Sequence, residues 1–226
     1  PKRASRSASV SRSLVRFFCK NLLRLAGEGF LAYSKGCLYQ YAMKVCSTEN
    51  MQIAERELIV SGTPARTLMK LASAGIAESL MQFFPDPGLC VAYVGKGNNG
   101  GDALTVLNIL KQHGWEIGFR TAYPRNEWSE LSVRQLAEIS PPPQEYQAPP
   151  LPHTGKPMIL LDGLLGIGAK GMLRREISAL CAEMNYIRNR CGAVRTVAID
   201  IPTGVDPDTG MPQQNAVEAD FTMCIG

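Results

Sequence analysis

LCVAYVGKGNNGGDALTVLNILKQ, residues 89–112, decides the fold class. Its first six residues, Leu89–Val94, form a continuous apolar run that ends at a glycine, as expected of a central parallel strand buried on both faces. After a glycine-rich loop, Ala103–Gln112 has apolar residues at helical spacing and is closed by His113 and Gly114. A strand, a loop and a helix in this order predict a βα unit of a parallel sheet.

The same alternation extends in both directions along the chain. Helical spacing occupies residues 48–59 and 64–83, where Thr63 is the predicted N-cap and Pro64 the first helical residue. Further strands are predicted at Trp115–Ala122, Ile159–Leu161, Val194–Ile199 and Phe221–Ile225, and further helices at 127–139 and 173–190. We predict that the Pro-rich residues 141–157 form a surface connection without either element. The pattern favours an α/β fold, a three-layer α/β/α sandwich with a mostly parallel central sheet.

The formal net charge of +4 is concentrated at the start of the chain. Residues 1–42 hold eight Lys or Arg and one acid, Glu28, which leaves 16 basic and 19 acidic residues in the remainder. A mildly acidic domain argues against a nucleic-acid footprint and favours a small-molecule or protein partner. No apolar run approaches the roughly 18 residues of a membrane span. We therefore expect neither nucleic acid nor membrane as a partner.

Residues 1–42 are rich in Arg and Ser, which is typical of an organelle transit peptide. A second interpretation is upstream sequence translated from a wrong start, because domain-like sequence begins at Met43. We treat 1–42 as a leader that is disordered or not native, and 43–226 as the domain. The expected location is cytoplasmic, or mitochondrial or another organelle if the leader is genuine. The seven scattered cysteines indicate reduced thiols in a reducing compartment.

Three polar loops follow apolar strands: GKGNNGGD (95–102), DGLLGIGAKG (162–171) and DIPTGVDPDTG (200–210). Because ligands bind outside the carboxyl ends of parallel strands, we expect the three loops to converge on one site. The glycines of the first loop permit positive φ and close backbone approach, and the helix start attracts phosphate. Asp102 as a plain helix cap, and Asn98 and Asn99 as plain turn formers, are the competing interpretation.

Gly95, Gly97 and Gly100 also satisfy the GxGxxG pattern of redox dinucleotide sites. That pattern requires an acid about 20 residues further on, whereas the second strand ends in Arg120-Thr121-Ala122-Tyr123. An NADP-dependent oxidoreductase that uses Arg120 or Arg125 is an alternative.

GKGNNGGDAL (95–104) resembles the GxGNNGGDG signature of the YjeF N-terminal family, the NAD(P)H-hydrate epimerases. ILLDGLLGIGAKG (159–171) resembles the family's strand, Asp and GxG-type loop, and VAIDIPTGVDPDTG (197–210) resembles its VDIPSGxDxxTG. ELIVSGTPARTLMKLAS (57–73) is similar to the region ahead of the first strand, so the resemblance covers about residues 47–226. Departures are Lys96, Ala103 and Gly163, and Thr203 in place of Ser; none removes a proposed contact.

The resemblance implies a Rossmann-like fold and an isomerase that interconverts the R and S epimers of hydrated NADH and NADPH (NADHX and NADPHX), without net redox. It implies one K⁺ per subunit on Asn99, Asp162 and Thr203, whose hard oxygen donors suit that ion. Implied substrate contacts are Asn98, Asn99, Gly100, Gly101, Asp102, Gly166, Ile167, Gly168, Ala169, Lys170, Gly171, Met172 and Asp200.

Inversion at C6 of the hydrated ring needs proton delivery and removal, so we predict Asp102 or Asp200 as acid/base and Lys170 as cationic partner. The resemblance also implies an NAD(P)H-hydrate dehydratase as functional or fused partner and a homodimer. Because family members continue beyond the sequence that ends at Gly226, we expect a domain truncated at its C-terminus. The alternative function is a non-catalytic scaffold or protein-binding module of the same fold, although such relatives lose the polar loops.

Overall fold

The computed structural model describes residues 47–148 and 155–225, and one compact unit runs from Thr48 to Ile225. Several predictions fall outside the described residues: the leader of residues 1–42, the domain start at Met43, three of the cysteines (19, 37 and 46), and residues 149–154 of the Pro-rich connection.

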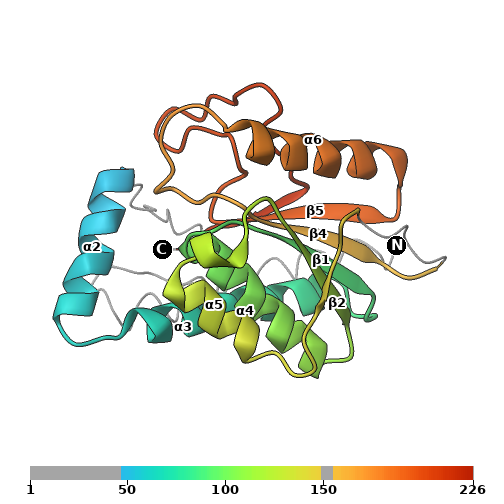
Figure 1. Ribbon diagram of the computed structural model, residues 1–226, viewed down its shortest axis with the longest axis horizontal. Coiled ribbons are helices and arrows are strands. Elements are labelled where there is room, and N and C mark those ends of the chain that lie inside the picture. Colours follow the sequence, from blue (N-terminus) through green and yellow to red (C-terminus); the bar gives the residue numbers. More distant parts are fainter. Residues whose placement is uncertain (1–46, 149–154, 226) are drawn as a thin grey trace, which may run out of the picture. The chain divides into compact units, whose positions relative to one another are not determined.

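The described strands form one sheet in the order β3-β2-β1-β4-β5-β6 (Figure 1). Their bounds are β1 Leu89–Val94, β2 Glu116–Thr121, β3 Gln144–Glu145, β4 Met158–Gly163, β5 Val194–Ile199 and β6 Phe221–Met223. Each pairing between neighbouring strands is parallel, which confirms the predicted parallel sheet. From β1 the strand order runs outward to β3 on one side, and from β4 it runs outward to β6 on the other, so the order switches between β1 and β4. In parallel α/β sheets, ligand crevices open at such a switch point.

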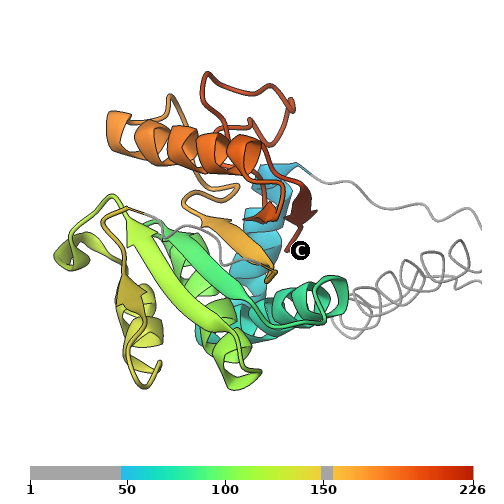
Figure 2. The same ribbon diagram turned by 90° about the vertical axis from the view of Figure 1, so that its right-hand side faces the viewer.

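Helices cover both faces of this sheet (Figures 1 and 2). Their bounds are α2 Thr48–Val60, α3 Ala65–Phe83, α4 Asn98–Gln112, the 3₁₀ turn η1 Arg125–Glu127, α5 Glu130–Ala137 and α6 Arg175–Arg190. One apolar core joins α3, α4 and α5 to the sheet, and a second joins α6 to the opposite face. The three-layer α/β/α sandwich is therefore confirmed. None of the described helices is long and apolar enough to cross a bilayer.

Strand β1 explains why the two cores form. Its side chains alternate between them, with Cys90, Ala92 and Val94 in the core of α4 and Val91 and Tyr93 in the core of α6. All six residues of the strand are buried, as the continuous apolar run predicts for a strand with both faces covered.

Two helix starts differ from the prediction. Helix α4 begins at Asn98 rather than Ala103, because the run Asn98–Asp102 is already helical. Thr63 is not the N-cap of α3; Pro64 occupies that position without a side-chain cap, and its carbonyl accepts the first helical hydrogen bonds. Proline can start a helix because it needs no amide partner there.

The prediction that residues 141–157 form no element is wrong at one point. Gln144 and Glu145 form the short edge strand β3, paired with Gly118 and Phe119 of β2. The prolines lie outside these two residues, so they do not interrupt the pairing. The expectation of unpaired thiols is confirmed for Cys90, Cys181, Cys191 and Cys224, the described cysteines.

Candidate functional site

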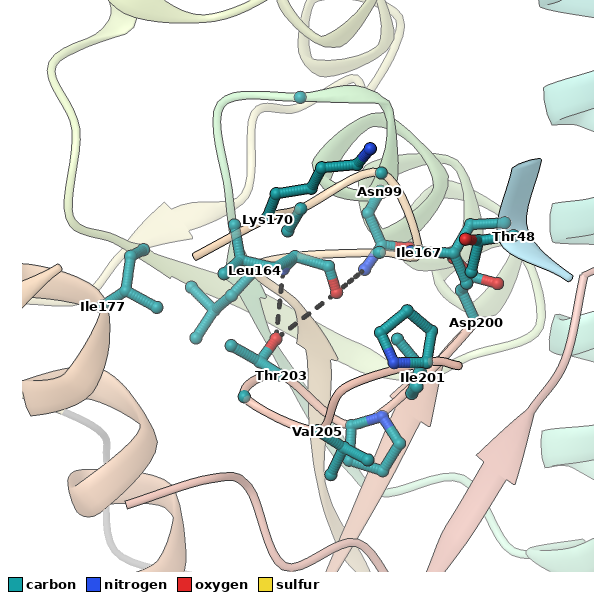
Figure 3. A pocket seen from close by; sticks show the side chains of 18 of the residues that line it. Thr48, Asn99, Leu164, Ile167, Lys170, Ile177, Asp200, Ile201, Thr203 and Val205 are labelled. Carbon is teal, nitrogen blue, oxygen red and sulfur yellow. Dashed lines mark hydrogen bonds between the residues drawn. The ribbon is translucent and has the colours of Figure 1, made fainter. Parts of the chain in front are cut away.

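A cleft of about 860 Å³ opens at the carboxyl ends of the strands (Figure 3). The first loop contributes Lys96, Gly97, Asn98, Asn99 and Asp102 to its lining, and the second and third loops contribute all of residues 164–174 and 200–208. The volume lies within the range of about 300–1,000 Å³ typical of small-molecule sites. The three polar loops meet as the sequence predicts, and residues 166–172 form a wall of the cleft.

Gly95 and Gly100 of the first loop are needed for close packing and not for a positive φ. A Cβ at Gly95 would lie 1.8 Å from the carbonyl oxygen of Leu164, and a Cβ at Gly100 would lie 2.1 Å from that of Gly95. In contrast to the expectation, none of the glycines at 95, 97, 100 and 101 has a positive φ. Glycine at 95 allows the first loop to lie directly against the second.

Hydrogen bonds connect the three loops around the backbone of the second. The Asn99 Nδ2 donates to the Leu165 carbonyl at 3.0 Å, and the Leu165 N–H donates to the Thr203 Oγ1 at 3.1 Å (Figure 3). The Ile167 N–H donates to the Asp200 Oδ2 at 2.7 Å. Asn99 of the first loop and Asp200 and Thr203 of the third, about 100 residues further on, are therefore all hydrogen-bonded to the second loop.

Asp162 lies behind the cleft and does not border it. Its carboxylate is fully buried and accepts from the Thr203 hydroxyl and the Thr203 N–H, both at 2.7 Å, and from the Leu164 N–H at 3.2 Å. Burial raises its pKa to about 6 although these hydrogen bonds oppose the shift. Asn99, Asp162 and Thr203 are thus joined, with the Leu165 backbone between Asn99 and Thr203.

Asp102 is the fifth residue of α4, four residues beyond Asn98, and borders the cleft. The N-cap of α4 is Gly97, so the competing role of Asp102 as a helix cap does not hold. Burial raises the pKa of Asp102 to about 7. A hydrogen bond from the buried Ser73 hydroxyl, at 3.2 Å, lowers that pKa, while the charges of Asp200 and Glu55 raise it. This carboxyl can both give and take a proton near neutral pH.

Asp200 occupies a backbone conformation that L-residues rarely adopt, with φ 69° at the end of β5. Its N–H donates to the Met223 carbonyl at 2.8 Å. Burial raises the pKa of its carboxyl, and the hydrogen bond from the Ile167 N–H opposes that rise. Rare backbone conformations of this kind concentrate at functional sites.

The cleft also has a cationic side. Lys170 and Arg174 line it from the second loop, and Lys96 lines it from the first. The Lys96 ammonium lies 3.3 Å from Glu127 and 4.8 Å from the centroid of the Tyr123 ring. Cations at this wall are suited to the phosphates of a nucleotide.

Arg120 and Arg125, the predicted phosphate readers of the oxidoreductase alternative, do not line the cleft. Arg120 donates to both carboxylate oxygens of Glu183, at 2.8 and 2.6 Å, and Arg125 donates to Glu145 at 3.0 Å. Neither arginine is therefore placed to contact a cofactor phosphate in the cleft, as the GxGxxG interpretation requires.

Sequence reasoning missed one wall of the site. Thr48, Gln52 and Glu55 of α2 line the cleft, and the Thr48 hydroxyl donates to Asp208 of the third loop at 2.9 Å. The spacing of four and three residues places these side chains on one face of the helix. That polar stripe was visible in the sequence, but nothing there showed that it faces a cleft.

The family model for the YjeF-related protein N-terminus matches residues 65–226. The chain belongs to the YjeF N-terminal family. Membership accounts for the order of the three loops, which is the order in which the family's motifs occur along the chain.

Among YjeF N-terminal relatives, the chain is 34% identical to the NAD(P)H-hydrate epimerase of Rhodopirellula baltica, over 71% of this chain and 65% of that protein. It is 32% identical to the NAD(P)H-hydrate epimerase of Clavibacter michiganensis, over 78% and 77%. It is 33% identical to the bifunctional NAD(P)H-hydrate repair enzyme Nnr of Archaeoglobus fulgidus, over 80% of this chain. The match spans 36% of that bifunctional protein, so the chain corresponds to about a third of it.

The crystal structure of yeast ynu0, YNL200c, has a similar fold. Its TM-score is 0.67 at 24% sequence identity, over 80% of this chain and 79% of the yeast chain. The likeness supports the fold of this chain.

Proposed function

We propose that this chain interconverts the R and S epimers of hydrated NADH and NADPH. The observation that carries the proposal is Asp102, a carboxyl with a pKa raised to about 7 that borders the cleft. Efficient general acid/base catalysis needs a pKa near the working pH. Two of the relatives named above bear the name NAD(P)H-hydrate epimerase, which supports this substrate class.

The proposed reaction is a loss and return of water at C6. A proton is delivered to the C6 hydroxyl, the C6–O bond breaks, and the ring nitrogen forms a double bond to C6. Water then adds to the other face of the planar ring and loses a proton, so no electrons leave the molecule. Ring opening and closure is the other path, and it also requires a proton donor and acceptor. Asp102 can take part in either, and Asp200 and Lys170 remain the other predicted participants.

We propose that the substrate's phosphates lie between the start of α4 and the second loop. Helix starts attract anions through free N–H groups and the helix dipole, and Gly97, Asn98 and Asn99 bring the start of α4 to the cleft. Lys170 and Arg174 supply positive charge on the adjacent wall. Asp102 and Asp200 also line the cleft, and because carboxylates repel phosphate, the uncharged hydrated ring is the part of the substrate that suits the space beside them.

We further propose that Asn99, Asp162 and Thr203 hold one K⁺. Their oxygen atoms are an amide, a carboxylate and a hydroxyl, which suit a hard cation, and Asp162 is a fully buried carboxylate. Within the described ranges, no three His, Cys, Asp or Glu residues gather to hold a metal. When bound, the ion would neutralise Asp162 and fix the second and third loops. The homodimer, the dehydratase partner and the location in the cell stay predictions.

The experiment is to supply a single purified epimer of NADHX and follow the appearance of the other by chromatography, with protein and without. A protein-dependent exchange rate supports the proposal, and a rate equal to the protein-free rate overturns it in favour of the scaffold alternative. Unchanged absorbance at 340 nm in the same samples separates epimerisation from an oxidoreductase, which would consume or form reduced cofactor.

A further inference from the structure

Helix α2 contributes polar side chains to the cleft. It has no buried residue, yet Thr48, Gln52 and Glu55 all line the cleft. Thr48 donates its N–H and its hydroxyl to the Asp208 carboxylate, at 3.0 and 2.9 Å. Gln52 approaches the second loop, where a Cβ at Gly168 would lie 3.7 Å from its Nε2. The helix therefore completes the cleft and adds nothing to the apolar core.

Glu55 adds a carboxylate from α2 to Asp102 and Asp200 in the cleft. The charge of Glu55 raises the pKa of Asp102. Partial burial and the charge of Asp200 in turn raise the pKa of Glu55. One carboxylate oxygen of Asp200 accepts a hydrogen bond from the Ile167 N–H, at 2.7 Å. Among the described residues, Glu55 forms no side-chain hydrogen bond or ion pair, so its carboxylate is available to a ligand in the cleft.

The chemistry at C6 calls for two proton-transfer groups. The hydroxyl leaves from one face of the ring and water arrives at the other, so one group protonates the leaving oxygen and another deprotonates the incoming one. A single carboxyl on α4 would have to reach both faces. A carboxyl on a different element relieves that requirement, and Glu55 is the one that α2 supplies to the same cleft.

We propose that Glu55 is a second acid/base residue, which contacts the hydrated ring and shares with Asp102 the proton transfers at C6. This inference rests on the proposed epimerase function. In one turnover the first carboxyl gives its proton to the hydroxyl, which leaves as water, and the second takes a proton from the incoming water. The ring is unchanged except for its configuration, and one proton has moved between the two carboxyls.

The test compares Glu55→Gln, which keeps size and removes acidity, with Glu57→Gln, an exposed glutamate on the same helix. General acid/base groups contribute on the order of 10²–10⁴-fold, so E55Q should slow epimer exchange by at least about 100-fold at unchanged NADHX binding, measured by calorimetry. E57Q should exchange within twofold of the wild type. Glu55→Asp, which keeps the carboxyl, should be faster than E55Q.

The pH profile separates this role from a structural one. The charged groups that line the cleft are Glu55, Lys96, Asp102, Lys170, Arg174, Asp200, Asp206 and Asp208. Because the charge of Glu55 raises the pKa of Asp102, the limb of the profile that reports Asp102 should move to lower pH in E55Q. A structural defect would lower the rate at every pH without moving the limb.

Each outcome decides a different point. A wild type without exchange overturns the proposed function and this inference together. A wild type that exchanges beside an E55Q variant as fast as E57Q overturns the role of Glu55 alone. Slow exchange in E55Q with weakened binding, an unmoved pH limb and no recovery in E55D also overturns it, because α2 would then serve only to complete the cleft.

Discussion

Burial, a hydrogen bond and neighbouring charges all affect the pKa of Asp102. Burial alone would favour the neutral acid, and the Ser73 hydroxyl partly restores the charged form. Ser73 lies on α3, fully buried, and also approaches the Asp102 carbonyl at 3.3 Å. The pKa of the proposed acid/base residue is therefore set in part from outside the polar loops.

Replacing Ser73 by Ala should raise the pKa of Asp102 further, because the carboxylate loses its hydrogen bond. The limb of the pH–rate profile near pH 7 should move to higher pH, which initial rates of epimer exchange at a series of pH values would measure. Ser79→Ala is the matched control, since Ser79 is equally buried on α3 but donates to the Gly75 carbonyl at 2.8 Å. Equal profiles for S73A and S79A would contradict this assignment.

Burial of Asp102 should also make stability depend on pH. Its pKa is raised from 3.8 to about 7 on folding, so its favourable contribution is present below pH 3.8 and is lost as the pH rises through 7. Relative to Asp102→Asn, the wild type should lose up to about 4 kcal/mol of unfolding free energy between pH 4 and pH 8. Urea denaturation of both proteins measures this difference, and a difference that stays constant with pH would refute it.

At the scale of elements, β1 and β4 were predicted well because their apolar residues form continuous runs that are buried on both faces. The start of α4 was not, because Asn98–Asp102 has the composition of a loop. Packing against the second loop winds these residues into a helix, and composition does not report such packing. The two-residue strand β3 was missed for a related reason: it forms by pairing with β2, an interaction distant in sequence.

The first loop offers a test of close packing. Gly95→Ala would place a methyl group 1.8 Å from the backbone oxygen of Leu164, which cannot move without the second loop. We expect a loss of about 1–3 kcal/mol or more of unfolding free energy. Gly97→Ala, at a position with no atom within 4 Å and a φ of −92°, should change stability far less. Equal losses in urea denaturation would show that the loops do not pack as described.

At the scale of the molecule, the convergence of the three loops could be predicted because parallel strands end at one edge of a sheet. The wall formed by α2 could not, since its position depends on contacts such as Thr48 with Asp208, 160 residues apart. Placing Asp162 behind the cleft also required the structure. An Asp after a strand looks the same in sequence whether it faces a ligand or the interior.

The proposed K⁺ links these loops, so it should stabilise the whole unit. An ion that binds only the folded state raises stability by mass action, and KCl should therefore raise the Tm relative to choline chloride of equal ionic strength. Asp162→Asn should lose this difference, whereas Asp86→Asn, an exposed acid away from the cleft, should keep it. A potassium effect that persists in D162N would place the ion elsewhere.

The initial rate of epimer exchange by wild type and Asp102→Asn, each given one purified NADHX epimer, tests the central claim most directly. We predict rapid formation of the second epimer by the wild type, and a rate at least about 100-fold lower for a folded D102N protein. Exchange by D102N at the wild-type rate, or exchange by neither protein above the protein-free rate, would contradict the account.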